Sequence, residues 1–494
     1  MTSIELAEKW SRKFKDIKLS DTLKEIGLDA PVMTQRLGAD PYAIVFDGRI
    51  YLYMTGDVLE YEEDGVTSKP NSFQLINTIN VVSSDDLVNW TDHGTVYAAG
   101  KDGAATWGNN SWAPAAAYKE INGKMRFFLY FANSGNGIGV VCADSPIGPF
   151  IDPIKKPLIS RQTPLCDSVE WLFDPAVLMD DDGSAYIYFG GGVPGDKYAA
   201  PGTGRVAKLG EDMISLSGDP VAMDIPFLFE DSGIHKMGNK YYYTYCTNFN
   251  VSEEGTKKYG FENGEIAYMM SDNPMGPFEY KGVILKNPGY YYGCEGNNHH
   301  CVFEFKNEWY ITYHTQILEK QLGVSGGYRC THISKLTINS DGTIEKFPSI
   351  DRSSLIQAKY INPYKDVDAT TMATMGGLNT IQEGEVSVKY GSGNMVLSDI
   401  NDGDWLAVYG VDFGTSGARE FTACVKAMAG TCGAIEIRID GIDKEVIGYI
   451  EINETANEQF EEVTTQLLKK VTGVHDLIFI FCGEGYNVDY WRFS

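Results

Sequence analysis

Positive charge is scarce in this chain of 494 residues. It carries 41 Lys and Arg against 67 Asp and Glu, which gives a formal net charge of −26. A protein that binds nucleic acid needs clustered Lys and Arg to neutralise the phosphates. The composition therefore argues against a nucleic-acid partner, and it suits a neutral ligand better than an anionic one.

Cysteine is also sparse and without pattern. The nine Cys are an odd number with no CxxC pair, which predicts free thiols rather than a disulfide framework. No apolar run is long enough to span a membrane. The first 31 residues are charged throughout and lack the apolar core of a signal peptide. We therefore expect no membrane partner and a cytoplasmic location; a leader segment ahead of this sequence would make the protein secreted instead.

Aromatic residues, in contrast, are plentiful. They make up 12% of the chain, with 30 Tyr and 8 Trp. Flat aromatic faces often stack on sugars, but Tyr and Phe also simply fill β-strands. Composition alone leaves both interpretations open. A chain of this length is too long for a single hydrophobic core, so two domains or one large closed architecture are expected.

A repeat of roughly 55 to 75 residues runs through most of the chain. Five segments each open with an Asp, Asn or Gly turn and continue into an alternating aromatic strand, which is the pattern of a β-hairpin. They are FDGRIYLYMTG from 46, INGKMRFFLYFANS from 121, DDGSAYIYFGG from 181, MGNKYYYTYCTN from 237 and FKNEWYITYHTQ from 305. A second pattern lies between them: ADSPIGPFIDP from 143 and SDNPMGPFEYKG from 271 share a Gly-Pro-Phe.

Such self-similarity is typical of propellers, in which each repeat forms one four-stranded sheet around a central channel. Five copies predict a five-bladed β-propeller over residues 33–350. An array of β-sandwiches is the alternative, but it would repeat with a longer module. Residues 1–32 are expected to form a polar, partly helical lead-in.

The sequence pattern changes after a turn-rich connection that ends near residue 355. Short alternating strands follow, with turns every eight to twelve residues. This pattern predicts a β-sandwich (jelly-roll) domain over residues 355–494. The fold class is thus all-β, with a propeller followed by a sandwich.

Three carboxylates stand just ahead of the hairpin of their own repeat. Asp40 lies in GADPY, Asp174 in LFDPA and Glu230 in FLFEDSG, while the fifth repeat has His299 and His300 there. The inner strands of propeller blades line the channel, so these side chains should converge. An Asp before a Pro or a strand can merely cap a turn. Three acids at the same position of the repeat favour a functional site instead.

Convergent carboxylates suit glycoside hydrolysis. One acid protonates the leaving oxygen, and a carboxylate about 6.5–9.5 Å away activates water in an inverting enzyme. A third carboxylate nearby raises the pKa of the acid.

At these residues the sequence resembles glycoside hydrolase family 43. The matching motifs are ADP at the first strand, WAPA from 112, FDPAVLMDDDG, FEDSGIHKMGNKYYYTY and NNHHCVFEFKNEWYITYH, in the order of the family. The resemblance covers about residues 33–350 and implies a five-bladed propeller and an inverting mechanism. It implies that Asp40 is the general base, Asp174 the pKa modulator that orients the acid, and Glu230 the general acid.

The resemblance also implies further contacts. His299 matches a position that binds calcium on the propeller axis in many members, although calcium prefers oxygen ligands and the two histidines could only hydrogen-bond within the channel. Trp112 stands where the family often presents an aromatic side chain to substrate, and it could equally be a buried filler. Glu295 is a fourth carboxylate near the same mouth that could bind substrate.

The C-terminal part resembles a family 6 carbohydrate-binding module, through motifs such as NDGDWLAVYG and GAIEIRIDG. The resemblance implies a second calcium site with Asp368 and Asp489, but Thr370 replaces one of the usual ligands. Asn487 matches a sugar-contacting position. The exposed Trp of the usual binding loop is missing, with Phe460 in that neighbourhood. The module therefore binds sugar weakly or mainly buttresses the propeller.

The predicted function is removal of α-L-arabinofuranosyl side groups from arabinoxylan or its oligosaccharides by an inverting glycosidase. The alternative within the class is a β-xylosidase acting on xylo-oligosaccharides, because both sugars have nearly the same outline. A non-catalytic glycan-binding propeller is the alternative from another class, since a fold does not imply chemistry.

Overall fold

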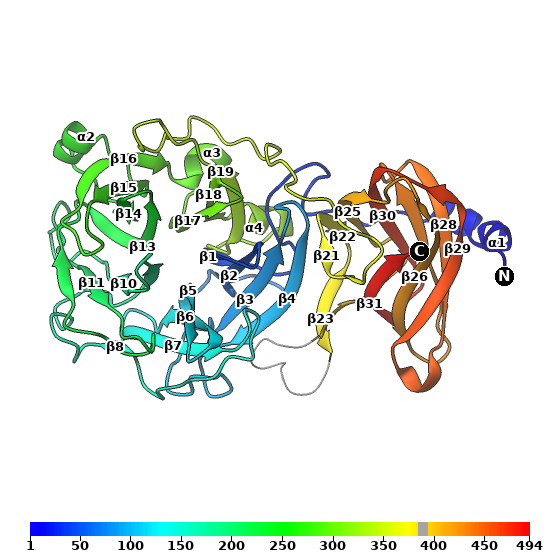
Figure 1. Cartoon of the computed structure of the whole chain (residues 1–494), viewed down its shortest axis with the longest axis horizontal. Helices are drawn as coiled ribbons and strands as arrows, with labels where there is room; N and C mark the ends of the chain where they lie inside the picture. Colours follow the sequence, from blue (N-terminus) through cyan, green and yellow to red (C-terminus); the bar gives the residue numbers. More distant parts are fainter. Residues whose placement is uncertain (384–393) are drawn as a thin grey trace.

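The computed structural model describes residues 1–383 and 394–494. The molecule is elongated: residues 39–335 form a larger part at one end, and a smaller part that begins near residue 367 lies at the other (Figure 1). The regular structure of the described residues is mainly strand, as an all-β chain requires. No described helix is both long and apolar enough to cross a membrane.

The larger part holds five separate antiparallel sheets. The first is β1 (Ala39–Phe46), β2 (Arg49–Thr55), β3 (Thr78–Ser84) and β4 (Trp90–Tyr97); the second is β5 (Trp112–Ile121), β6 (Lys124–Ala132), β7 (Gly137–Ala143) and β8 (Ile159–Ser160); the third is β9 (Ala176–Met179), β10 (Ala185–Phe189), β11 (Gly204–Lys208) and β12 (Val221–Met223). The fourth is β13 (Leu228–Met237), β14 (Lys240–Thr247), β15 (Ile266–Ser271) and β16 (Glu279–Leu285), and the fifth is β17 (His300–Phe305), β18 (Glu308–Thr315) and β19 (Cys330–Lys335).

The five hairpins predicted from the sequence repeat are all present. In each sheet the first two strands are joined at the predicted turn; the β1–β2 pair, for example, closes with Phe46 opposite Arg49. Asp47 and Gly48 both have a positive φ there, at 49° and 73°. Two consecutive positive φ values match the right-handed twist of the flanking strands, which is why Asn and Gly recur at these turns.

The first strands of the five sheets lie against one another. Strand β1 contacts β5 and β17, β5 contacts β9, and β13 contacts both β9 and β17. The contacts therefore run in chain order and return to β1. Residues at corresponding ends of these strands can meet although they are far apart in sequence.

The described residues of the smaller part form two further sheets. One contains β23 (Asn379–Glu383), β24 (Asn394–Ser398), β31 (Tyr486–Phe493), β26 (Ala418–Ala427) and β29 (Glu461–Val471), with β20 (Val367–Asp368) paired to β31; the other contains β22 (Thr374–Gly376), β25 (Trp405–Asp412), β30 (Val474–Cys482), β27 (Cys432–Ile439) and β28 (Glu445–Asn453). Both contribute to one apolar core that includes Val408, Phe421, Ile437 and Trp491.

A backbone pairing joins the two parts. Strand β21 (Thr371–Met372) belongs to the C-terminal segment but adds to the edge of β4. Beside it, buried Asp92 accepts hydrogen bonds from Thr380 (2.6 Å) and Gln35 (3.0 Å) and pairs with Arg36. Thr370 donates to the backbone carbonyl of Asp92 at 3.2 Å. The junction is therefore polar, specific and continuous with the first sheet.

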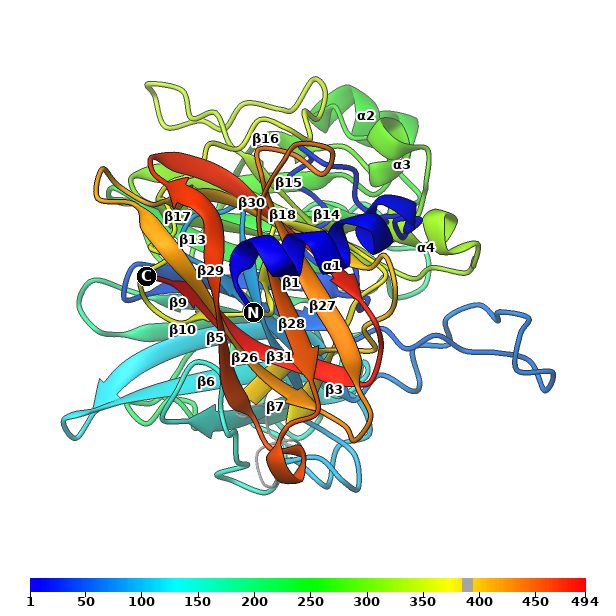
Figure 2. The ribbon, with the colours of Figure 1, turned by 90° about the vertical axis from the view of Figure 1, so that its right-hand side faces the viewer.

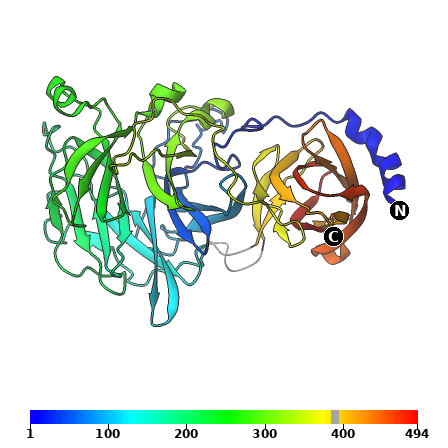
Figure 3. The same cartoon turned by 45° about the horizontal axis from the view of Figure 1, so that its top comes forward.

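The N-terminal helix α1 (Ser3–Asp16) packs on the smaller part, at the end opposite the five sheets (Figures 1 and 3). A capping box fixes its start: Thr2 accepts from the N–H of Glu5, and the Glu5 carboxylate accepts from the N–H of Thr2. Trp10 and Phe14 are buried with residues of β25, β28 and β30. The chain then returns to the larger part. The lead-in, which the sequence predicts to be polar, therefore has one apolar face that is buried against the smaller part.

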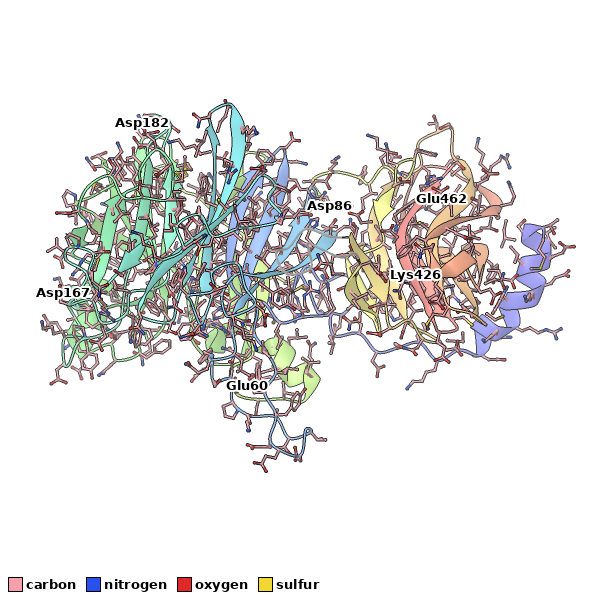
Figure 4. All side chains as sticks on the ribbon, turned by 90° about the horizontal axis from the view of Figure 1, so that it is seen from below. Glu60, Asp86, Asp167, Asp182, Lys426 and Glu462 are labelled. Carbon is pink, nitrogen blue, oxygen red and sulfur yellow. The ribbon has the colours of Figure 1, made fainter. Side chains whose placement is uncertain are left out.

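The remaining helices are short. They are α2 (Glu253–Tyr259), α3 (Pro288–Tyr292), α4 (Ile317–Leu322) and a single 3₁₀ turn at Ala456–Glu458. A long loop between β2 and β3 projects from the body of the molecule, with Glu60 on it (Figures 2 and 4).

Trp10→Ala should destabilise the protein, because the indole is 4% exposed and fills the space between α1 and β25, β28 and β30. We expect a loss of about 3 kcal/mol in the free energy of unfolding, as for other buried Trp residues. Urea denaturation measures it, with exposed Glu8→Ala as the matched control on the same helix. Equal stability of the two variants would contradict the packing role.

Candidate active site

The backbone has an unusual left-handed conformation at acidic residues that lie in or just ahead of the first strands. Asp40, Ala113, Asp174 and Asp231 have left-handed φ values of 46°, 43°, 49° and 68°. The pairing shifts by extra residues at these positions in β1, β5 and β13, while Asp174 lies two residues ahead of β9. Such bulges re-aim side chains and recur next to active sites. A non-glycine residue pays about 1 kcal/mol or more for this conformation, so the fold maintains a strained backbone at four equivalent places.

Asp40 forms the centre of one charged group. The guanidinium of Arg329 donates to its Oδ1 at 2.9 Å and also makes a bidentate pair with Asp57, at 2.7 and 3.0 Å. The backbone N–H of Asp40 donates to Nδ1 of His314 at 3.1 Å, while Nε2 of His314 donates to the carbonyl of Asn297. All these side chains are buried. Asp40 is thus held through both its backbone and its carboxylate.

These contacts set the ionisation of Asp40. Burial by itself would raise its pKa, but the charge of Arg329, aided by His299 and His314, lowers the pKa of Asp40 well below its ordinary value. Asp40 therefore stays an anion over the whole physiological range.

Asp174 and Glu230 behave in the opposite way. Burial raises the pKa of Asp174 well above its ordinary value, and the negative charge of Asp40 adds to the shift. Burial likewise raises the pKa of Glu230, with further contributions from Asp174 and Asp40. Because neighbouring carboxylates oppose the ionisation of each other, this pair retains a proton near neutrality.

A fourth carboxylate, Asp231, joins these groups. Its backbone N–H donates to Oδ2 of Asp174 at 2.9 Å. Its Oδ1 lies 3.0 Å from Nε2 of His299, and its Oδ2 accepts from the backbone N–H of His300 at 3.1 Å and faces Nδ1 of the same ring. Burial raises the pKa of Asp231 to about 8, although His299 partly offsets this.

His299 lies between the acids from different sheets. Its Nδ1 is 3.4 Å from Oδ1 of Asp40 and 3.8 Å from Oδ2 of Asp174. The structure therefore brings Asp40, Asp174 and His299 of the sequence-based prediction directly together. Glu230 directly precedes Asp231, is 8% exposed and senses the charges of Asp174 and Asp40.

The donor set around His299 does not fit an ion held mainly by protein. Both ring nitrogens face carboxylate oxygens, and calcium prefers six to eight oxygen ligands. Within residues 1–383 and 394–494, no group of three or more His, Cys, Asp or Glu is arranged to hold a metal. The axial calcium ion stays a prediction, and no step of the chemistry is derived from it.

Trp112 is half-buried at the edge of this centre. Its Nε1 donates to the carbonyl of Phe73 at 2.9 Å, and the two rings pack edge to face at 6.4 Å. The Arg329 guanidinium lies 5.2 Å above the Phe73 ring. Trp112 therefore does not act as a buried filler, and the aromatic pair adjoins the arginine that holds Asp40.

Glu295 lines a cleft of about 740 Å³ together with Phe229, which directly precedes Glu230. Asn297, whose carbonyl accepts from His314, lines it as well, while Glu230 itself does not. Phe249 and Tyr290 line it and are 40% and 62% exposed. Exposed aromatic faces and polar groups together suit a sugar chain.

The C-terminal site residues lie in the smaller part, away from this centre. Asn487 donates to Glu383 at 3.1 Å and borders a cleft of about 500 Å³ with Lys426. Asp368 is exposed on β20, opposite Tyr490 and close enough to Asp489 for their charges to interact. Thr370 donates to the backbone carbonyl of Asp92 at the junction.

Sequence reasoning missed Arg329, Asp57, Asp231 and His314. Asp231 directly follows Glu230, and its equivalence to Asp40 and Asp174 is visible only in the shared left-handed φ. Asp57 lies two residues after the aromatic strand of the first repeat, which is a weak signal in the sequence. Arg329, in GYRCTHIS, belongs to no repeated pattern, so only the folded chain identifies it.

Comparison with family profiles gives two matches. Glycosyl hydrolases family 43 matches residues 28–344, and carbohydrate binding module (family 6) matches residues 368–494. The two matches cover the larger and the smaller part of the molecule, respectively.

Two curated relatives align with nearly the whole chain. The arabinoxylan arabinofuranohydrolase of Bacillus subtilis (strain 168) is 47% identical over 95% of this chain and 93% of its own length. The arabinoxylan arabinofuranohydrolase of Paenibacillus polymyxa is 46% identical over 95% of this chain and 74% of its own length. A xylosidase/arabinosidase of Bacteroides ovatus is more distant, at 32% over 56% of this chain and 85% of its own length.

A solved structure is also similar throughout. The crystal structure of a family 43 arabinoxylan arabinofuranohydrolase from Bacillus subtilis, in complex with cellotetraose, is 46% identical and superposes with a TM-score of 0.90. The match covers 96% of this chain and 99% of the other.

Arg329→Met should destabilise the protein in a pH-dependent way, because it leaves two buried carboxylates without their cation. We expect a loss of about 3 kcal/mol in unfolding free energy at neutral pH. In the wild type, the depressed pKa of Asp40 contributes stability above the unfolded pKa of about 3.9, and this contribution is lost as the pH falls through the folded pKa. The difference between the two proteins should therefore shrink in acid.

Denaturation curves at several pH values test this. Arg126→Met is the control, since Arg126 pairs with exposed Asp144 on the surface and should cost less than about 1 kcal/mol. A loss for Arg329→Met that stays constant down to acidic pH would contradict the charge argument.

Proposed function

This chain belongs to glycosyl hydrolases family 43 and is a glycosidase, and we propose that it removes α-L-arabinofuranosyl side groups from arabinoxylan or its oligosaccharides with inversion. The observation that carries the proposal is the opposite shift of two buried carboxyl groups: the pKa of Asp40 is lowered and the pKa of Glu230 is raised. Inverting hydrolysis needs one ionised and one protonated carboxyl group at the same time.

The hydrogen bonds indicate which of the coupled pair holds the proton. Asp174 accepts the N–H of Asp231, which favours its ionised form. Oε1 of Glu230 is buried and has no hydrogen-bond partner among the described residues. A charge on Glu230 would therefore be poorly solvated, so we assign the proton to Glu230.

The reaction follows from these ionisation states. The carboxyl group of Glu230 gives its proton to the glycosidic oxygen as the bond to the anomeric carbon breaks. Asp40 takes a proton from a water molecule whose oxygen attacks that carbon from the opposite face. Asp174 keeps Glu230 protonated through its charge and does not bond to the sugar. The arabinose released first then has the inverted anomeric configuration.

The substrate class rests on the relatives and on the cleft. Both relatives that match 95% of this chain are named arabinoxylan arabinofuranohydrolase. The cleft that holds Phe249, Tyr290 and Glu295 would take the polymer that carries the arabinose, since Phe229, the chain neighbour of Glu230, lines it. Trp112 and Phe73 border the other side of Arg329 and would contact the sugar there.

We also propose the domain arrangement in detail. The five sheets would be the blades of a five-bladed β-propeller over about residues 33–350, supported by the cyclic contacts of their first strands. Residues 355–494 would form a jelly-roll sandwich, supported by two sheets around one core. The lead-in up to residue 32 would belong functionally to the smaller part, since α1 packs there.

The role of the smaller part is chiefly to support the first sheet. The β4–β21 pairing and the contacts of Asp92 favour this. Asn487, beside a cleft, remains a proposed sugar contact. A calcium ion between Asp368 and Asp489 stays a prediction, as does the cytoplasmic location.

The alternatives have less support. The relative named xylosidase/arabinosidase is more distant and spans only part of the chain. A non-catalytic glycan-binding protein has no use for carboxyl groups with opposed pKa shifts.

The test of function is an NMR time course on an arabinoxylan oligosaccharide. We expect free arabinose whose first-formed anomer is inverted, and an intact xylose backbone. Glu230→Ala should lower turnover by at least about 100-fold, as loss of a general acid does, and azide should restore activity on an activated substrate. Release of xylose instead, or normal turnover by Glu230→Ala, would refute the proposal.

Asp174→Asn should change the pH profile as well as the rate. The substitution removes a negative charge that raises the pKa of Glu230, so Glu230 would lose its proton at a lower pH. The alkaline limb of kcat/KM should therefore move to lower pH. Asp181→Asn is the control, because that carboxylate is 84% exposed and pairs with Lys236. An alkaline limb that stays in place would contradict the role of Asp174.

A further inference from the structure

We propose that Asp231 is a positioning residue that fixes the acid side of the active site, by tying Asp174 and Glu230 to the histidines of the fifth sheet. The inference rests on the proposed roles of Asp174 and Glu230. Asp231 is fully buried and would not touch the sugar. Its contacts join three different sheets at one point.

The backbone of Asp231 holds Asp174. Its N–H donates to Oδ2 of Asp174 at 2.9 Å, across the boundary between the third and fourth sheets. Asp231 makes this bond from a left-handed φ of 68°, a conformation that Asp tolerates but that costs free energy. The side-chain contacts of Asp231 must therefore maintain the conformation.

Those contacts come from the fifth sheet. Oδ2 faces both the backbone N–H of His300, at 3.1 Å, and Nδ1 of its ring, while Oδ1 lies 3.0 Å from Nε2 of His299. The ring of His300 is buried and turns its Nδ1 toward Asp231. Its Nε2 is buried and has no partner among the described residues. The ring proton is therefore on Nδ1 and donates to Asp231.

The space around His300 is adapted to this contact. A Cβ built on Gly233 would lie 2.2 Å from Oγ1 of Thr244 and 3.0 Å from Nε2 of His300. A side chain at Gly233 would clash with Thr244 and crowd the ring of His300, so the glycine leaves room for this ring beside Asp231. Gly233 thus contributes to the contact between His300 and Asp231.

Loss of the Asp231 contacts would displace Glu230. Glu230 and Asp231 are adjacent, and the pairing of β13 with β14 shifts between Glu230 and Gly233. If the side chain of Asp231 is lost, the bulge is free to relax, and both Glu230 and its partner Asp174 move. Asp40 is held separately by Arg329 and His314, so the base should keep its position.

This separation predicts a dependence on the leaving group. A natural glycoside needs a proton from the acid, whereas 4-nitrophenolate leaves with little help. Asp231→Ala should therefore lower kcat on an arabinoxylan oligosaccharide by at least about 100-fold and on 4-nitrophenyl α-L-arabinofuranoside by less than about tenfold. The KM should change little, because Asp231 makes no substrate contact.

Two further variants keep the test decisive. Asp231→Asn retains a polar atom toward each histidine and should recover at least about tenfold of the loss on the oligosaccharide. His300→Phe keeps the ring but removes its donor, and it should show the same leaving-group dependence in weaker form. Asp86→Ala is the matched control: Asp86 is 1% exposed and accepts backbone N–H bonds from Val88 and Asn89 near the junction (Figure 4). It should lower stability without changing the ratio of the two activities.

The outcomes separate the two proposals. If Glu230→Ala itself shows no leaving-group dependence, the acid is misassigned and the proposed function fails. If Glu230→Ala shows the dependence but Asp231→Ala and His300→Phe lose activity equally on both substrates, or not at all, the positioning role of Asp231 is overturned. An Asp231→Asn variant as impaired as Asp231→Ala would also overturn it.

Discussion

The burial of four carboxyl groups around one cation governs this protein. Asp40, Asp174, Glu230 and Asp231 are each at most 8% exposed, and among the described residues Arg329 is the buried guanidinium beside them. One positive charge cannot keep four carboxylates ionised out of water. Arg329 is shared between Asp40 and Asp57, so Asp40 stays ionised, while the other three carboxyl groups hold their protons more tightly. The difference in proton affinity that hydrolysis needs is therefore a result of unequal access to one arginine.

Stability and chemistry depend on different parts of the structure. Hairpins and cores of the five sheets supply stability, while the strained left-handed positions at Asp40, Asp174 and Asp231 direct the acids. The proposed base, Asp40, is anchored to the first and fifth sheets through Arg329 and His314, and the proposed acid side is anchored through Asp231 and the histidines. The smaller part pairs with the first sheet at β4. Each proposed catalytic group thus depends on at least two sheets.

Much of the fold could be predicted from the sequence, because local turns and alternation carry the information. The five hairpin turns and the strands near 405, 418, 432, 445 and 474 lie where the patterns place them. Strand β29 (Glu461–Val471) was missed, since its Lys- and Glu-rich sequence shows little apolar alternation. The apolar face of α1 was missed as well, because its three-residue stripe is hidden among charges.

The sequence by itself determined the repeat, the all-β class and the carboxylates just ahead of its hairpins, since these depend on residue type and short-range spacing. Only the tertiary structure decided which groups share a proton and which stay ionised. Arg329 is 289 residues from Asp40 along the chain, and Asp231 reaches His299 and His300 across a sheet boundary. Electrostatic coupling acts through a few ångströms of buried space, and no local pattern in a chain encodes that distance.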